Sequence, residues 1–148
     1  YIANALDQLS QIALAGHNGH PIIVLEDDLL ASGGVESVRK VFGEVFAQIP
    51  ASADMVYLEL CFETCQKLRY SHTAPKLARA YAPSCSAAIL FTAAGAARVS
   101  SLAHPVFDVI DRMYQHLIVT GLVQAYIVSI YDCVYMYIRI YEYVYCYI

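Results

Sequence analysis

The segment Pro21-Ile22-Ile23-Val24-Leu25-Glu26-Asp27-Asp28 determines how the rest of the chain is interpreted, because an apolar run leads directly into three carboxylates. A short apolar run with polar residues on either side predicts a strand that is buried on both faces. Side chains alternate along an extended chain, so Glu26 and Asp28 are expected on one side and Asp27 on the other. Ligands of open α/β sheets bind at the carboxyl ends of such strands. The acids are therefore expected at a ligand-binding edge.

The acids 26–28 have two interpretations. Carboxylates that converge at a strand end repel one another unless a cation or protons neutralise them, and a hard divalent ion is their natural partner. In the structural alternative, the strand simply turns and its acids cap the next helix. The structural alternative is the commoner one in proteins at large, and the resemblance described below favours the metal.

The composition limits the classes of protein to consider. The 148 residues are enough for one domain with a core, and 59% hydrophobic against 15% charged residues excludes a disordered chain. A net charge of −4 without a Lys/Arg cluster argues against nucleic acid as a partner. The most apolar run, about residues 117–131, is too short and too polar to predict a membrane span.

Helical and extended patterns alternate along the chain, which predicts a parallel sheet flanked by helices. Gly16 is expected to end the first helix and Gly121 the last. Thr92 is a candidate N-cap, Gly95 is expected to permit close helix-on-sheet packing, and Asp111 is placed to cap a helix. The expected helices are residues 2–15, 35–49, 93–99 and 112–119, and the expected strands are 22–25, 55–60, 84–92 and 123–129.

Residues 61–80 carry four of the nine Lys and Arg residues and are expected to form a variable excursion from the sheet. Lys67 and Arg69 could meet a phosphate there, although solvated surface is the usual role of such residues. Cys61 and Cys65 have a spacing that zinc favours in a helix, but no second Cys/His pair accompanies them. A disulfide from Cys85 to one of this pair, in an oxidising compartment, and buried free thiols are equal alternatives.

Both ends of the chain are unusual. The first residue is Tyr1 and leads into a helix already under way, so we interpret the chain as a fragment, for which a missing signal peptide is uninformative. Residues 130–148 hold seven of the thirteen tyrosines. Their period-two pattern is typical of a strand, but their Tyr, Ile, Val, Cys and Met residues are what an alternating TA/TG repeat encodes. We therefore expect a domain at 1–129 and a low-complexity, aggregation-prone tail at 130–148 outside the native fold.

Four segments, taken in order, resemble glycosyltransferase family 25, which includes lipopolysaccharide-modifying glycosyltransferases and procollagen galactosyltransferases. The similarity covers about residues 5–129, and the Glu-Asp-Asp strand is its most specific part. The resemblance implies a GT-A-type, Rossmann-like α/β fold with a mostly parallel sheet flanked by helices, as a partial catalytic domain. The segments are Glu26-Asp27-Asp28 with its strand, Asp54-Met-Val-Tyr-Leu-Glu, Ser84-Cys-Ser-Ala-Ala-Ile-Leu-Phe-Thr-Ala-Ala-Gly-Ala and Pro105-Val-Phe-Asp-Val-Ile-Asp.

The resemblance also implies an activity: transfer of a sugar from a nucleotide donor to a protein or glycan hydroxyl. Glu26, Asp27 and Asp28 match the family's DXD-like motif and would bind the donor, a UDP-sugar. Asp28, with Glu26 on the same side, would hold Mn²⁺ (or Mg²⁺) against the diphosphate, and Asp27 is assigned mainly to backbone capping. Such a metal neutralises the charge that the departing diphosphate gains.

An inverting transfer needs a base near the acceptor hydroxyl. Two acids, Asp108 and Asp111, match the Pro-Val-Asp-like element, and we favour Asp111 because its surroundings start a helix; Glu63 is a third candidate. The family implies the ER or Golgi lumen if the protein is eukaryotic. The family's first nucleotide-binding strand and Ser-His motif would lie upstream of Tyr1, so the activity of this fragment by itself is left open.

Two other classes of protein were weighed. A non-catalytic α/β interaction module, or an inactive glycosyltransferase fragment, would use the same acids as helix caps. A flavodoxin-like or receiver-type domain also places acids at strand ends, but here the second strand does not end in Asp and no candidate lysine follows a later strand. The glycosyltransferase interpretation is therefore the leading one.

Overall fold

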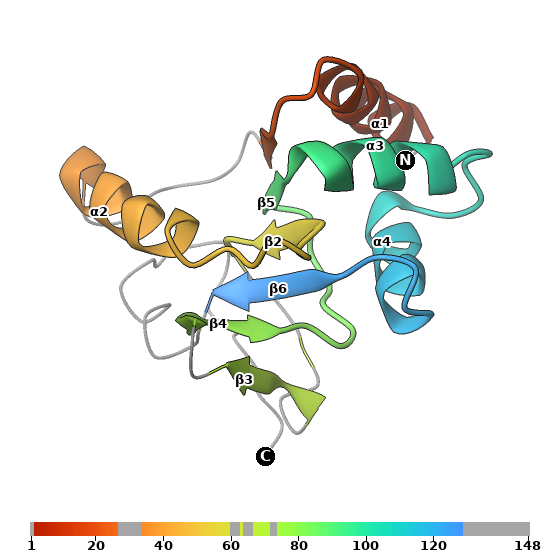
Figure 1. The fold of residues 1–148 in the computed structure, drawn as a ribbon. Helices are drawn as coiled ribbons and strands as arrows, with labels where there is room; N and C mark the ends of the chain where they lie inside the picture. The colour runs from red at the N-terminus through yellow and green to blue at the C-terminus, as the bar shows by residue number, and fades with distance from the viewer. Residues whose placement is uncertain (1, 27–33, 60–62, 64–66, 72–73, 129–148) are drawn as a thin grey trace.

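The computed structural model describes residues 2–26, 34–59, 63, 67–71 and 74–128 of the chain (Figure 1). Asp27 and Asp28, the cysteines at 61 and 65, and the tail 130–148 lie outside the described residues. The predictions made for them therefore stay predictions. Within the described ranges, no helix combines the length and apolar character needed to cross a membrane.

Six strands form one mixed sheet in the order β1-β5-β2-β6-β4-β3 (Figure 1). Neighbouring strands are antiparallel throughout the described sheet, except for the parallel pair β2–β6. The α/β class is confirmed, but the expected mostly parallel sheet is wrong. The strands are β1 (Ile22–Leu25), β2 (Met55–Tyr57), β3 (Arg69–Ser71), β4 (Ala74–Arg79), β5 (Ala88–Phe91) and β6 (Ala125–Val128).

The error in strand direction has two sources. Residues 61–80, expected as an excursion, contribute β3 and β4, which pair with each other and add to the sheet beside β6. β5 then enters between β1 and β2 and runs antiparallel to both. Helix–strand alternation predicts parallel neighbours only where a helical crossover joins them, and described helices are found before β2 and after β5 but not between β3 and β4.

Helices cover both faces of the sheet. Along β2, Met55 and Tyr57 face a core that is shared with α1, α3 and α4, whereas Val56 faces a second core that includes Val45 of α2. This split follows from the two-residue alternation of a strand. Figure 1 shows α2 on its own, away from the other three helices. The helices are α1 (Ile2–His17), α2 (Gly34–Phe46), α3 (Ala93–Leu102) and α4 (Ile110–Val119).

The first strand forms where the sequence predicts it, but its burial differs. Ile22, Ile23 and Val24 are half-buried, and Leu25 is 58% exposed. β1 stands at the end of the strand order, so among the described strands it pairs with β5 alone. The expectation of a strand buried on both faces is wrong, because an apolar run by itself does not distinguish a central strand from an edge.

Close packing of helices depends on two glycines. The first helix continues to His17, so Gly16 does not end it; instead a Cβ at Gly16 would lie 2.5 Å from the backbone nitrogen of Ala97 in α3. The Gly95 position lies against the Asp54 carbonyl, which confirms the packing role expected for it. Both glycines therefore permit backbones to approach more closely than any side chain allows.

The ends of α3 and α4 follow their sequence signals. Thr92 is the N-cap of α3, and its hydroxyl oxygen accepts the Gly95 N–H at 3.0 Å. Gly121, with φ of 76°, follows the last turn of α4, as expected of a residue that terminates a helix in the left-handed region.

Candidate functional site

Three strands end at the same edge of the sheet. β1 and β2 both run antiparallel to β5, and β6 runs parallel to β2, so β1, β2 and β6 share one direction. Their carboxyl ends, together with the amino end of β5, form what we call the carboxyl edge. Glu26 directly follows β1 and therefore stands at this edge. This placement agrees with the expectation from the sequence, although β1 is not a central strand.

The backbone and side chain of Glu26 are both held by the segment before β5. Its N–H donates to the Ala87 carbonyl at 2.9 Å, which extends the strand pairing by one residue. Its Oε1 accepts the Ser86 hydroxyl at 2.9 Å, and Ser86 is buried. This partner was not among the residues expected at the site; its signal in the sequence is the run of small residues 84–88 at the start of the third expected strand.

Cys85, next to Ser86, has an unusual backbone. Its φ is 98°, a value that residues with a side chain rarely adopt and that costs conformational energy. Cys85 is disulfide-bonded, so of the two alternatives weighed for this thiol the disulfide is the one found. A strained residue constrained by a covalent bond thus adjoins the serine that binds Glu26.

A hard divalent cation is compatible with what is described at the carboxyl edge. A carboxylate that accepts one hydroxyl hydrogen bond keeps acceptor capacity for a metal, and oxygen ligands are what Mn²⁺ and Mg²⁺ take. Among the described residues no group of three or more His, Cys, Asp or Glu side chains is arranged to hold a metal. Because Asp27 and Asp28 fall outside that set, the metal assignment to Asp28 and Glu26 stays a prediction.

Asp111 lies in the first turn of α4, and the capping role weighed for it is wrong. The helix begins two residues earlier than expected, at Ile110, and its N-cap is Val109, which makes no side-chain cap bond. Asp111 Oδ1 is buried, and within the described chain it has no hydrogen-bond partner. A buried carboxylate oxygen without a donor is costly, so this atom marks a position where a ligand would be stabilising.

Two buried tyrosines accompany Asp111. Burial raises the pKa of Tyr114, and the charge of Asp111 adds to the effect. Burial likewise raises the pKa of Tyr57, with further contributions from Tyr114, Asp111 and Glu63 in that order. The Tyr114 hydroxyl has no partner among the described residues, while its ring packs edge-on against Phe91 at 5.6 Å between centroids. Asp111, Tyr57 and Tyr114 form what we call the acid–tyrosine cluster.

Glu63 and Asp108, the other two candidate bases, both accept hydrogen bonds from backbone N–H groups. Glu63 accepts the backbone N–H groups of Tyr81 and Ala82, both at 2.9 Å, and so fixes a turn after β4. Asp108 is exposed, and its Oδ1 accepts the N–H of Val109 at 2.8 Å. Of the three acids, Asp111 is the one with a buried carboxylate oxygen that has no partner among the described residues and could accept a hydrogen bond from another molecule. No described contact joins Asp111 to Glu26.

Asp54, which opens the second motif of the resemblance, has a structural role. It is 2% exposed, and its Oδ2 accepts the Gln124 N–H at 2.8 Å and contacts Arg98 at 3.1 Å. Its contacts join β2, β6 and α3 rather than leaving the carboxylate open to a ligand. The residue at a motif position can therefore be required for folding and not for ligand binding.

Comparison of the chain with protein-family models, curated proteins and solved structures finds no match. The class established by the fold is an α/β protein with a mixed, helix-flanked sheet. A more specific assignment of function rests on the four sequence motifs, taken in their order along the chain, and on the contacts described above. We state it below as a proposal.

Proposed function

We propose that this chain is part of a metal-dependent glycosyltransferase, which transfers a sugar from a nucleotide-sugar donor to a glycan or protein hydroxyl. The observation that carries the proposal is the position of Glu26. It is the first acid of Glu26-Asp27-Asp28, it follows β1 at the carboxyl edge of the sheet, and Ser86 holds its side chain. Ligands of α/β sheets bind at such an edge.

In this proposal Glu26 and Asp28 hold Mn²⁺ or Mg²⁺, and the motif 26–28 binds the diphosphate of a UDP-sugar. The bound cation would offset the negative charge that develops on the departing diphosphate. The contribution of the chain is to orient the ligands. The Ser86 hydroxyl and the Ala87 carbonyl fix the side chain and backbone of Glu26 before any donor arrives.

Asp111 is proposed as the base that takes the proton from the acceptor hydroxyl as its oxygen attacks the anomeric carbon. Its contacts favour it over Asp108 and Glu63, because it alone among the three has a buried oxygen without a described partner. The proposal implies an acceptor-binding position beside Tyr57, the last residue of β2.

The α/β fold is compatible with the proposed GT-A-type arrangement, and the disulfide is compatible with the proposed compartment. A GT-A-type arrangement would use residues 1–129 as a partial catalytic domain, with the carboxyl edge facing the donor. The disulfide at Cys85 fits an oxidising compartment, which supports placement in the ER or Golgi lumen.

A second candidate function is a non-catalytic α/β interaction module. The observation that favours it is the structural use of acids elsewhere in the chain. Asp54 and Glu63 both bind backbone N–H groups, and the Glu26 carboxylate accepts a hydrogen bond from another side chain, the Ser86 hydroxyl. In this case the acids at 26–28 stabilise a turn and bind no cation.

Calorimetric titration of UDP distinguishes the two. With Mn²⁺ present we expect UDP to bind, and with EDTA we expect binding to be lost. Asp28→Asn and Glu26→Gln should each weaken Mn²⁺-dependent binding by about tenfold or more. Glu36→Gln is the matched control, because Glu36 is exposed on α2 and pairs with Arg39 of the same helix. UDP binding that needs no metal and survives both variants would contradict the proposal, and no binding at all would favour the module.

A further inference from the structure

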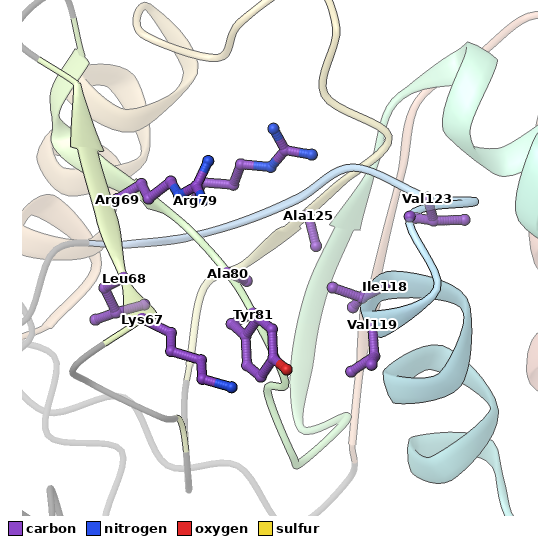
Figure 2. A pocket seen from close by; sticks show the side chains of 11 residues that line it. Lys67, Leu68, Arg69, Arg79, Ala80, Tyr81, Ile118, Val119, Val123 and Ala125 are labelled. Carbon is purple, nitrogen blue, oxygen red and sulfur yellow. The ribbon is translucent and has the colours of Figure 1, made fainter.

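A cavity of about 550 Å³ lies at the amino end of β6, the opposite end of that strand from the carboxyl edge. Figure 2 shows the side chains that line it. Its basic residues are Lys67, Arg69 and Arg79, and Tyr81 forms part of the same wall. No acid lines it. The remaining lining is apolar or small and includes Leu68, Ile118, Val119, Val123 and Ala125. Cavities of this size and mixed character are typical of small-molecule sites.

The two arginines are held next to each other by the sheet. Arg69 of β3 is directly opposite Arg79 of β4 in the strand register, and Figure 2 shows the two side chains running alongside one another. Like charges directly opposite in a sheet are destabilising. Neither guanidinium forms an ion pair with a carboxylate of the described chain. An anion between them would remove the repulsion and supply the missing acceptors.

The third cation is fixed in place. The Lys67 ammonium lies over the ring of Tyr81, 4.0 Å from its centroid (Figure 2), a favourable cation–π geometry. Glu63 binds the backbone N–H groups of Tyr81 and Ala82, which holds the wall that carries the ring. The lysine is therefore positioned by the fold on the same cavity as the two arginines.

The end of α4 borders the cavity, and a helix C-terminus carries partial negative charge. In this structure the last carbonyls of α4 already accept hydrogen bonds. The carbonyls of His116, Leu117 and Ile118 accept backbone N–H groups from the turn 120–123. They are thus poor partners for the basic side chains, and the positive charge of the cavity stays available to a ligand.

This cavity is separate from the proposed donor site. Arg79 pairs with Tyr126, and the Ala80 N–H donates to the Ala125 carbonyl at 3.0 Å, so the cavity adjoins the amino end of β6. The carboxyl edge, with Glu26, lies at the other end of the same strands. A ligand in this cavity would not share the metal of the motif 26–28.

We propose that this cavity binds the phosphate group of a phosphorylated small molecule. The phosphate lies between Arg69 and Arg79, whose guanidinium groups match phosphate oxygens in bidentate geometry. Lys67 adds a third positive charge. The organic part of the ligand packs on the apolar wall formed by Ile118, Val119 and Val123.

The first test is calorimetric titration of the chain with inorganic phosphate and with phenyl phosphate, in EDTA so that no metal at the motif 26–28 contributes. We expect both probes to bind, and phenyl phosphate to bind more tightly because its ring contacts the apolar wall. Absence of binding at about 10 mM of either probe would overturn the proposal. Equal affinities for the two probes would overturn the assignment of the apolar wall.

Variants connect the binding to the two arginines. Arg69→Gln and Arg79→Gln should each weaken phosphate binding by about tenfold or more. Arg39→Gln on α2, at an exposed arginine far from the cavity lining, is the matched control and should bind as the parent does. Binding that both cavity variants leave unchanged would overturn the proposal.

A fold control accompanies the binding data. Each cavity variant removes one member of a like-charged pair, so the melting temperature of the ligand-free protein should be unchanged or higher. In the parent protein phenyl phosphate should raise the melting temperature, and in the variants this rise should be lost. A rise that persists in both variants would place the bound phosphate elsewhere and overturn the proposal.

Discussion

The carboxylate of Asp54 accepts the backbone N–H of Gln124 at 2.8 Å, across seventy positions of sequence. Asp54 immediately precedes β2, and Gln124 immediately precedes β6. The bond is reciprocal, because the Asp54 N–H donates to the Gln124 carbonyl at 2.9 Å. These two contacts align the starts of the parallel pair β2–β6 and so set which way the carboxyl edge faces.

The Asp54 contacts predict unequal effects of two variants. Asp54→Ala leaves the half-buried Gln124 N–H without its acceptor and should cost about 3 kcal/mol of unfolding free energy. Arg98→Ala should cost less than about 1 kcal/mol, because the Arg98 side chain is 50% exposed and water screens its ion pair. Urea unfolding measures both values. Equal losses would show that the ion pair, and not the backbone contact, carries the stability.

Two helical glycines should respond in opposite directions to alanine. A Cβ at Gly95 would overlap the Asp54 carbonyl, which is backbone and cannot turn aside, so Gly95→Ala should destabilise by about 2 kcal/mol or more. A Cβ at Gly43, inside α2, meets nothing within 4 Å. Gly43→Ala should therefore stabilise by about 0.5–1 kcal/mol. Thermal unfolding of the pair tests this, and a stable Gly95→Ala protein would contradict the close approach.

The buried tyrosines predict a loss of stability in alkaline solution. Burial raises the pKa of Tyr57 and of Tyr114 above the usual value of 10.0, so above pH 10 the unfolded chain releases protons that the folded protein keeps. Their contribution is fully present below that pH and falls as pH rises, by about 1.4 kcal/mol per pH unit for each tyrosine.

Phenylalanine variants provide the control for this pH dependence. Tyr57→Phe and Tyr114→Phe should each flatten the decline of unfolding free energy measured between pH 9 and 11 (about the range where exposed tyrosines titrate equally in both states). Tyr114→Phe should also be neutral or stabilising near pH 7, because it removes a buried hydroxyl without a described partner. An unchanged slope in both variants would assign the alkaline loss to other groups.

The proposed base gives a prediction about activity. Asp111→Asn should slow UDP release from a UDP-sugar by about a hundredfold or more, while calorimetric UDP binding with Mn²⁺ stays as in the parent. Asp108→Asn is the matched control, because the Asp108 side chain is exposed and accepts the N–H of its neighbour Val109; this variant should keep the parent rate. If the Asp108 variant loses the rate and the Asp111 variant keeps it, the roles of the two acids are reversed.

Elements with strong local signals were predictable. The positions of α1, α2 and β1 followed from hydrophobic spacing, and Thr92 as an N-cap followed from its place before a helical pattern. Such signals depend on neighbouring residues only. Boundaries shifted by a few residues, as at Gly16, where a tertiary contact with α3 explains the glycine better than a helix end does.

The partners of the candidate site residues were not predictable. Ser86 lies sixty positions from Glu26 in the sequence, yet it supplies the hydrogen bond that holds that side chain. The pairing of Arg69 with Arg79 depended on a hairpin in residues that the sequence suggested were an excursion. Long-range pairing of this kind leaves no local pattern, because β3 is only three residues long and β4 does not alternate regularly between buried and exposed residues.

By itself, the sequence determined the α/β class and the placement of Glu26 after an apolar strand, because these depend on periodicity and on adjacent residues. Only the tertiary structure decided the strand order, the mostly antiparallel pairing and the position of β1 at the end of the sheet. The physical reason is that strand direction and neighbours are set by contacts such as that of Asp54 with Gln124. Those contacts form only when distant segments meet.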